Sequence, residues 1–143
     1  MKYEVEIKID RSREEVVSVF QDPDQIKAWQ PSFRSLEVIE GEPGATGSKT
    51  RLVYERRGKE TEMIETITNN SLPERFESIY EAKGVKNIHE NRFAEDRGST
   101  RWYVETEFQF SGFMKIVALF LRKAFPKETR SSMELLKQYV ESK

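Results

Sequence analysis

The chain has 143 residues and a balanced charge, with 24 Lys and Arg against 25 Asp and Glu, a single His and no Cys. This length fits one domain, so we expect residues 1–143 to form a single unit around one core. The lack of Cys excludes disulfides, thiolate zinc sites and cysteine nucleophiles, and the balanced charge argues against a general nucleic-acid binder. We expect no metal, no cofactor and no nucleic-acid partner.

The first predicted element is a half-buried strand, because residues 2–10 alternate between charged and apolar side chains. The same alternation is unlike a secretion signal, which needs an uninterrupted apolar stretch. The longest apolar stretch, residues 113–125, is interrupted by cations and is shorter than the roughly 20 residues that span a bilayer. We expect a cytoplasmic protein without stable membrane insertion.

Two short helices are predicted next. Ser12 and Glu15 have the spacing of a capping box, which satisfies free backbone donors at a helix start. Asp22 and Pro23 repeat the start signal, because Asp caps well and Pro is tolerated in the first turn.

From Phe33 to Ser111 the chain reads as a series of β-strands separated by Gly, Pro and Asn clusters. Short connections force antiparallel neighbours, because a parallel pair needs a crossover of about a dozen residues. The expected strands cover residues 36–39, 49–57, 60–68, 75–83, 85–95 and 99–110. The inward and outward faces of the strands at 49–57 and 60–68 remain open.

A long helix is predicted after Gly112, because the apolar period changes from two to the helical value. Pro126 removes a backbone hydrogen bond, so we expect a kink or a break near residues 123–126. The side chains expected to face the sheet from the first half of this helix are Phe113, Val117, Phe120 and Leu121.

This order of elements resembles the START-like superfamily known as SRPBCC, with the helix-grip fold, and most closely its polyketide cyclase/dehydrase-like branch. The likeness extends over nearly the whole chain, and the segments that carry it are Ser12–Val16, Asp22-Pro23 with Trp29, Gly44–Gly47, Leu72–Phe76, Gly98–Arg101 and Leu135–Tyr139. The resemblance implies an α+β fold in which a curved antiparallel sheet of about seven strands wraps around a long C-terminal helix. It also implies a cavity between them for a hydrophobic, lipid- or polyketide-like molecule.

The last strand has a clear pattern that turns Trp102, Thr106 and Phe108 towards the core. For the preceding strand, facing Asn87, His89 and Asn91 inwards buries neutral polar groups, whereas the opposite choice buries three charges. Because burial of unpaired charge is far more costly, we expect the neutral row inside. Such a row could orient a ligand.

His89 is the candidate acid/base group, because it alone among the side chains has an ordinary pKa near neutrality. A purely structural role for this His is the competing interpretation. Glu65 could point inwards as its partner, although the strand can also be read with Glu65 outside. Tyr54 and Tyr80 are further possible hydroxyl donors.

A pocket rim is expected at the junction of the helix pair and the sheet, where Trp29 and Phe33 flank residues 30–32. Core packing of both residues is the alternative. The full set of expected ligand-binding residues is Trp29, Phe33, Tyr54, Asn87, His89, Asn91, Trp102, Thr106, Phe108, Phe113, Val117, Phe120 and Leu121.

The first half of the long helix is apolar around most of its circumference, so something else should cover part of it. A partner copy in a homodimer, a membrane surface and a flap over the pocket are the options, and partner or flap is preferred. For the whole chain, the leading hypothesis is a carrier or sensor of a hydrophobic metabolite. The alternatives are a polyketide cyclase/dehydratase-type enzyme using His89, and a protein-interaction module resembling heat-shock ATPase activators.

Overall fold

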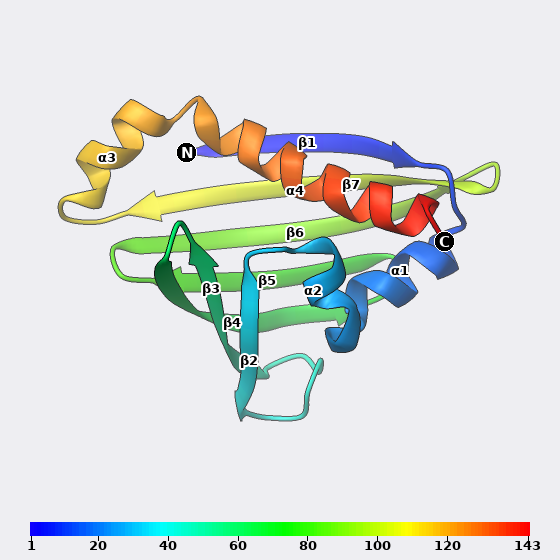
Figure 1. Ribbon diagram of the computed structural model, residues 1–143, viewed down its shortest axis with the longest axis horizontal. Coiled ribbons are helices and arrows are strands. Elements are labelled where there is room, and N and C mark those ends of the chain that lie inside the picture. Colours follow the sequence, from blue (N-terminus) through cyan, green and yellow to red (C-terminus); the bar gives the residue numbers. More distant parts are fainter.

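A computed structural model describes residues 1–143 and shows one seven-stranded antiparallel sheet with helices on one face (Figure 1). The strands lie side by side in the order β1-β7-β6-β5-β4-β3-β2. Their bounds are β1 Lys2–Ile9, β2 Phe33–Glu40, β3 Lys49–Arg56, β4 Lys59–Ser71, β5 Arg75–Ala82, β6 Val85–Asp96 and β7 Ser99–Phe110. The expected antiparallel meander and helix-grip fold are confirmed.

Short helices connect β1 to β2, as predicted. These are α1 Arg13–Gln21, the 3-10 helix η1 Pro23–Gln25, and α2 Ile26–Trp29. The Ser12 hydroxyl accepts from the Glu15 amide at 3.2 Å and donates to the Glu15 carboxylate at 3.1 Å, while the Asp22 carboxylate accepts from the Asp24 amide at 2.9 Å. Both start signals therefore cap the helices that the sequence predicted.

The β3–β4 hairpin turns at Arg57 and Gly58, which have φ of 53° and 75°. Two successive positive φ angles match a two-residue turn whose twist suits antiparallel strands. β4 is longer than predicted: Asn69 and Asn70 continue the ladder with β5, and the chain turns only at residues 72–74. The Asn pair resembled a turn, but pairing with β5 satisfies its backbone groups and keeps it in the strand.

The core lies between the β1–β7–β6 side of the sheet, α1 and the last helix. Its most buried members are Ile9, Val16 and Leu136, each with no exposed surface. The rings of Phe93 and Trp102 stack at 5.6 Å between centroids, and Phe20 of α1 meets both edge-on. This cluster fixes α1 and the helix above it against one end of the sheet.

The predicted C-terminal helix is divided into α3 Met114–Leu121 and α4 Ala124–Glu141. The break falls at residues 122–123, so the predicted interruption is confirmed. Pro126 lies in the first turn of α4, where its missing N–H has no intrahelical acceptor to lose. α4 crosses the sheet and packs on β1, whereas α3 lies beyond the end of β7 (Figure 1).

The prediction that the first half of the helical segment faces the sheet with Phe113, Val117, Phe120 and Leu121 is wrong. Phe113 is 74% exposed and Phe120 82% exposed, Leu121 is also exposed, and Val117 is half-buried. Ala118 is instead the buried residue of α3. The reason is placement: α3 follows the end of β7 and lies past the sheet, so only its side with Ala118 packs against the rest of the protein.

Candidate ligand-binding site

A cavity of about 730 Å³ lies between the sheet and α4. The chain lines it with 22 residues, of which 12 are hydrophobic. They are Phe20, Trp29, Gln30, Pro31, Ser32, Tyr54, Arg56, Thr61, Met63, Tyr80, Ala82, Val85, Asn87, His89, Asn91, Trp102, Val104, Phe108, Thr129, Ser132, Met133 and Leu135. The cavity therefore joins residues from nearly every part of the sequence.

The polar row predicted on β6 faces this cavity. Asn87, His89 and Asn91 alternate with outward residues, because successive side chains of a strand point to opposite faces. The choice of this facing over the one that buries three charges is confirmed. Asn91 is 2% exposed and its side-chain oxygen accepts from the Trp102 indole N–H at 3.0 Å, so both groups are satisfied.

Thr106 on β7 links two members of the row. It is almost completely buried, lies directly across from His89 in the ladder, and its hydroxyl contacts Nδ1 of His89 at 3.1 Å. The Asn87 side-chain amide donates to the same hydroxyl and to the Glu107 carbonyl. Thr106 itself does not line the cavity; it holds Asn87 and His89 in place from beside them.

Burial lowers the pKa of His89 from 6.5 to about 4. Desolvation is the cause, because a charged imidazolium inside an apolar site loses its hydration without gaining a counter-charge. At neutral pH the ring is therefore uncharged, with one nitrogen able to donate and the other able to accept.

Glu65 points inwards on β4, but it does not pair with His89. Its neighbour across the ladder is Tyr80 of β5, and Tyr80 lies opposite Asn87 of β6. Burial raises the pKa of Glu65, and a hydrogen bond with Tyr80 partly opposes this rise. The pKa of Tyr80 is raised well above 10 by burial and by the adjacent carboxylate. Tyr80 thus separates Glu65 from the ring of His89, which it meets edge-on at 5.9 Å.

Tyr54 reaches the cavity from β3 and donates its hydroxyl to the Gln30 side-chain oxygen at 2.8 Å. Burial, followed by the charge of Glu65, raises the pKa of Tyr54 to about 12. Trp29 and residues 30–32 form part of the lining, as the rim prediction expected. Phe33 does not reach the cavity: it is buried and packs edge-on against Tyr54 at 5.7 Å.

The helical wall of the cavity comes from α4 rather than from α3. Its members are Thr129, Ser132, Met133 and Leu135, and the expected residues Phe113, Val117, Phe120 and Leu121 are not among them. The helical spacing of Met133 and Leu136 is the sequence pattern that indicates this wall. The prediction instead relied on the first half of the segment, because that half is more apolar. Phe125, at the start of α4, packs on Phe108 with ring centroids 4.9 Å apart.

The β3–β4 hairpin contributes exposed side chains to the lining of the cavity. Arg56 and Thr61 line it from the hairpin, and the Arg56 guanidinium pairs with the Glu128 carboxylate of α4 at 3.3 Å. Sequence reasoning missed both lining residues, because exposed polar side chains beside a turn have no distinctive pattern. Phe20 was missed as well, since its helical spacing indicated only core packing.

These features define a helix-grip domain with an internal cavity, the architecture of START-like proteins. A family model described as polyketide cyclase/dehydrase and lipid transport matches residues 1–141, and the chain belongs to this family. No curated protein matches the chain significantly.

Solved structures agree on the fold. The Zhui aromatase/cyclase from Streptomyces sp. R1128 superimposes with a TM-score of 0.82 at 13% identity, covering 99% of this chain and 93% of that one. A START superfamily protein from Mycobacterium smegmatis gives 0.77 at 15% identity, covering 99% and 97%. Ara h 8.0201 gives 0.81 at 13% identity, covering 100% and 99%. Identities this low support the fold and leave function to the site itself.

No helix of the chain is both long enough and apolar enough to cross a lipid bilayer.

Proposed function

We propose that this protein binds a largely apolar small molecule in the cavity between the sheet and α4, with one neutral polar group of the ligand directed at β6. The observation that carries the proposal is the mostly apolar cavity of about 730 Å³ with Asn87 and His89 on its sheet side. Ligand sites in proteins commonly span about 300–1,000 Å³ and combine apolar walls with a few converging polar groups.

The polar groups of the cavity favour an uncharged ligand. His89 is neutral around pH 7, because burial lowers its pKa to about 4. The charged side chain of the lining, Arg56, belongs to the exposed hairpin and already pairs with Glu128. A ligand carboxylate or ammonium beside β6 would lack a counter-charge, which is costly in an apolar site. A carbonyl or hydroxyl group suits this environment better.

The hydrogen bonds around Thr106 favour one tautomer of His89. Because the Thr106 hydroxyl accepts from Asn87, its own hydrogen is free to point at Nδ1 of His89. The ring proton then resides on Nε2, which can donate to a ligand oxygen. A lipid- or polyketide-like molecule with a ketone, ester or hydroxyl group has the required chemistry, and family membership supports that class.

Ligand retention tests the proposal directly. Native mass spectrometry of the protein purified from its own host should show a bound organic mass that is lost on denaturation. Nile red, a neutral fluorophore with a carbonyl group, should bind the emptied protein with an emission change. A cavity that rejects both would contradict the proposal.

A matched pair of variants locates the binding. Ala82→Phe places a large ring in the cavity and should weaken Nile red binding about tenfold or more, since it removes the volume the probe occupies. Ala45→Phe makes the same change in an exposed loop and should leave the affinity unchanged. Equal affinities for the two variants would place the probe elsewhere.

Enzymatic activity of the cyclase/dehydratase type is the second candidate, favoured by a single half-buried His whose ring is held from one side and faces the cavity. Glu65 does not assist it, so His89 would act alone or with Tyr80. For any ligand found by mass spectrometry, His89→Ala separates the two functions: a carrier loses affinity, whereas an enzyme loses turnover. An interaction module needs no cavity, and the cavity therefore supports the first two functions over it.

A further inference from the structure

The exposed apolar surface of the molecule is concentrated on α3 and its N-terminal flank. Of nine large hydrophobic residues that are exposed, five lie between positions 113 and 121: Phe113, Ile116, Leu119, Phe120 and Leu121. Their exposures range from 48% to 82%. Soluble surfaces carry isolated apolar side chains, but a contiguous cluster of large ones marks a contact surface.

The orientation of α3 turns this cluster outwards. Ala118 is buried against the rest of the protein. Ile116, Leu119 and Phe120 fall on the opposite side of the helix, because positions two residues apart differ by about 200° around a helix axis and those three or four apart share a face. We call these residues together with Phe113 the α3 patch. No segment of the chain covers it.

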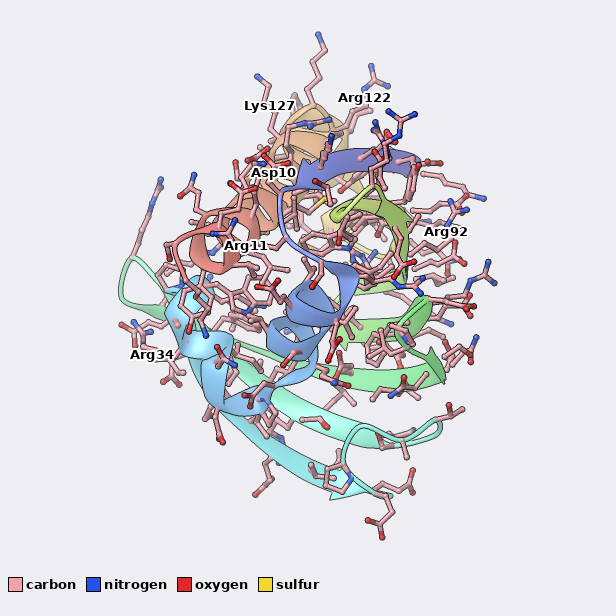
Figure 2. The ribbon with its side chains drawn as sticks, turned by 90° about the vertical axis from the view of Figure 1, so that its right-hand side faces the viewer. Asp10, Arg11, Arg34, Arg92, Arg122 and Lys127 are labelled. Atoms are coloured by element: carbon pink, nitrogen blue, oxygen red, sulfur yellow. The ribbon has the colours of Figure 1, made fainter.

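Cations without partners surround the α3 patch. Residues 108–127 include Lys115, Arg122, Lys123 and Lys127 and contain no Asp or Glu. None of the four cations takes part in an ion pair within the chain. Figure 2 shows Arg122 and Lys127 at one end of the molecule with their side chains extending into solvent. The segment is strongly positive although the whole chain has a formal net charge of −1.

The turn between β5 and β6 adds to this charge. The Gly84 carbonyl accepts from the Ser111 amide at 3.0 Å, and Gly84 lies against the side chain of Met114. Lys83, the neighbour of Gly84, therefore belongs to the same end of the molecule as the start of α3. The next acidic residue along the chain, Glu128, is already paired with Arg56.

We propose that α3 docks this protein on an anionic lipid surface, with the α3 patch entering the interface and the surrounding cations contacting lipid headgroups. Amphipathic helices bind membranes in this way, by burying an apolar face beside basic residues that attract anionic lipids. A second copy of the chain fits less well, because a symmetric dimer through α3 would place one cationic surface against another. A nucleic acid would match the charge but leave the large aliphatic side chains without an apolar environment.

This docking would bring the cavity close to the lipid surface. Phe125, near the start of α4 and four residues after the end of α3, packs on Phe108, which lines the cavity. The proposal does not depend on the identity of the cavity's ligand, since the α3 patch and its cations lie outside the lining.

Vesicle binding tests the proposal. The protein should sediment with vesicles of phosphatidylcholine and phosphatidylserine at low salt, and much less with phosphatidylcholine alone or at high salt. Leu119→Trp supplies a local probe, because both native Trp residues are buried. Its emission should shift to the blue when anionic vesicles are added, as the indole leaves water.

Two pairs of variants separate the apolar and electrostatic contributions. A double variant that carries Leu119→Ser and Phe120→Ser should reduce vesicle partitioning about tenfold or more. The control Ile39→Ser, at an exposed apolar site on β2, should not change it. Lys115→Gln with Lys123→Gln should reduce it about tenfold. The control double variant, Lys8→Gln with Lys49→Gln, lowers the net charge by the same amount at exposed sites outside α3. It should have little effect on vesicle partitioning.

Three results would overturn the proposal: no partitioning onto anionic vesicles, equal partitioning of the two lysine double variants, or a stable dimer by analytical ultracentrifugation that the Leu119→Ser and Phe120→Ser changes convert to a monomer. Variants at the cavity, such as Ala82→Phe, should leave vesicle binding intact.

Discussion

In the two helices that end the chain, the burial of apolar side chains is the opposite of what their compositions suggest. α3 consists almost entirely of apolar residues yet exposes most of them, whereas α4 is rich in charged and polar residues yet buries Met133, Leu136 and Val140 almost completely. What separates them is position. α4 runs along β1 and α1, so its apolar stripe meets the core, while α3 lies past the end of the sheet (Figure 1). Burial follows from the available surface and not from hydrophobicity alone.

The anchoring contacts of α4 reinforce this difference. The Tyr3 hydroxyl of β1 bonds to the Thr129 hydroxyl at 2.7 Å, and near the other end the Glu141 carboxylate accepts from the Asp10 amide at 2.7 Å. α3 has no comparable side-chain hydrogen bond to the sheet. α4 is consequently part of the folded core and of the cavity wall, and α3 is available for contacts outside the chain.

The largest expected effect is a difference in the free energy of unfolding between two truncations, one of a leucine in α4 and one of a phenylalanine in α3. Leu136→Ala removes a side chain with no exposed surface and should lower the free energy of unfolding by about 2–5 kcal/mol. Phe120→Ala, at a position 82% exposed, should change it by no more than about 0.5 kcal/mol. Guanidinium denaturation followed by circular dichroism measures both. A large loss for Phe120→Ala would mean that α3 packs against the protein in solution.

An intermediate effect concerns His89, which lines the cavity that α4 walls on the other side. Its pKa is about 4 when folded and about 6.5 when unfolded, so the unfolded chain binds more protons between these values. Stability is therefore fully present above pH 6.5 and falls as the pH decreases towards 4, by on the order of 3 kcal/mol. His89→Gln should remove this pH-dependent contribution.

The measurement is the difference in unfolding free energy between wild type and His89→Gln at several pH values. Taking the difference cancels the carboxylates, including Glu65, whose raised pKa acts in the opposite direction over an overlapping range. A difference that stays constant from pH 7 to pH 4 would show that His89 is hydrated in the folded protein, and hence that the cavity around it is not dry.

The smallest effect concerns the C-terminal anchor of α4. The pKa of Glu141 is lowered mainly by the hydrogen bond from the Asp10 amide and then by that from Lys137. A carboxyl group whose pKa is lowered by folding stabilises the folded state at pH values above its unfolded pKa. This contribution is lost as the pH falls through the folded pKa. Glu141→Gln should therefore cost about 0.5 kcal/mol at neutral pH and less below pH 4. Glu134→Gln, about two turns earlier on α4 and without an ion pair, is the control.

Alternation and turn chemistry were sufficient to predict most of the fold. The antiparallel meander, both helix caps and the interruption of the C-terminal helix near residues 123–126 all follow from local rules that read only a few adjacent residues. The inward facing of Asn87, His89 and Asn91 could also be predicted, because the alternative would have buried three charges. Local rules could not place the ends of β4, since pairing with β5 extends that strand through Asn69 and Asn70.

By itself, the sequence determined the order of helices and antiparallel strands and the polar row on β6, because strand period, caps and the cost of buried charge act over short distances. The helix-grip arrangement of these elements was implied by the family resemblance. Only the tertiary structure decided that Glu65 meets Tyr80 instead of His89, and that α4 rather than α3 walls the cavity. Those outcomes depend on strand neighbours and on where a helix ends relative to the sheet. Such relations join residues that are distant along the chain, and no local pattern records them.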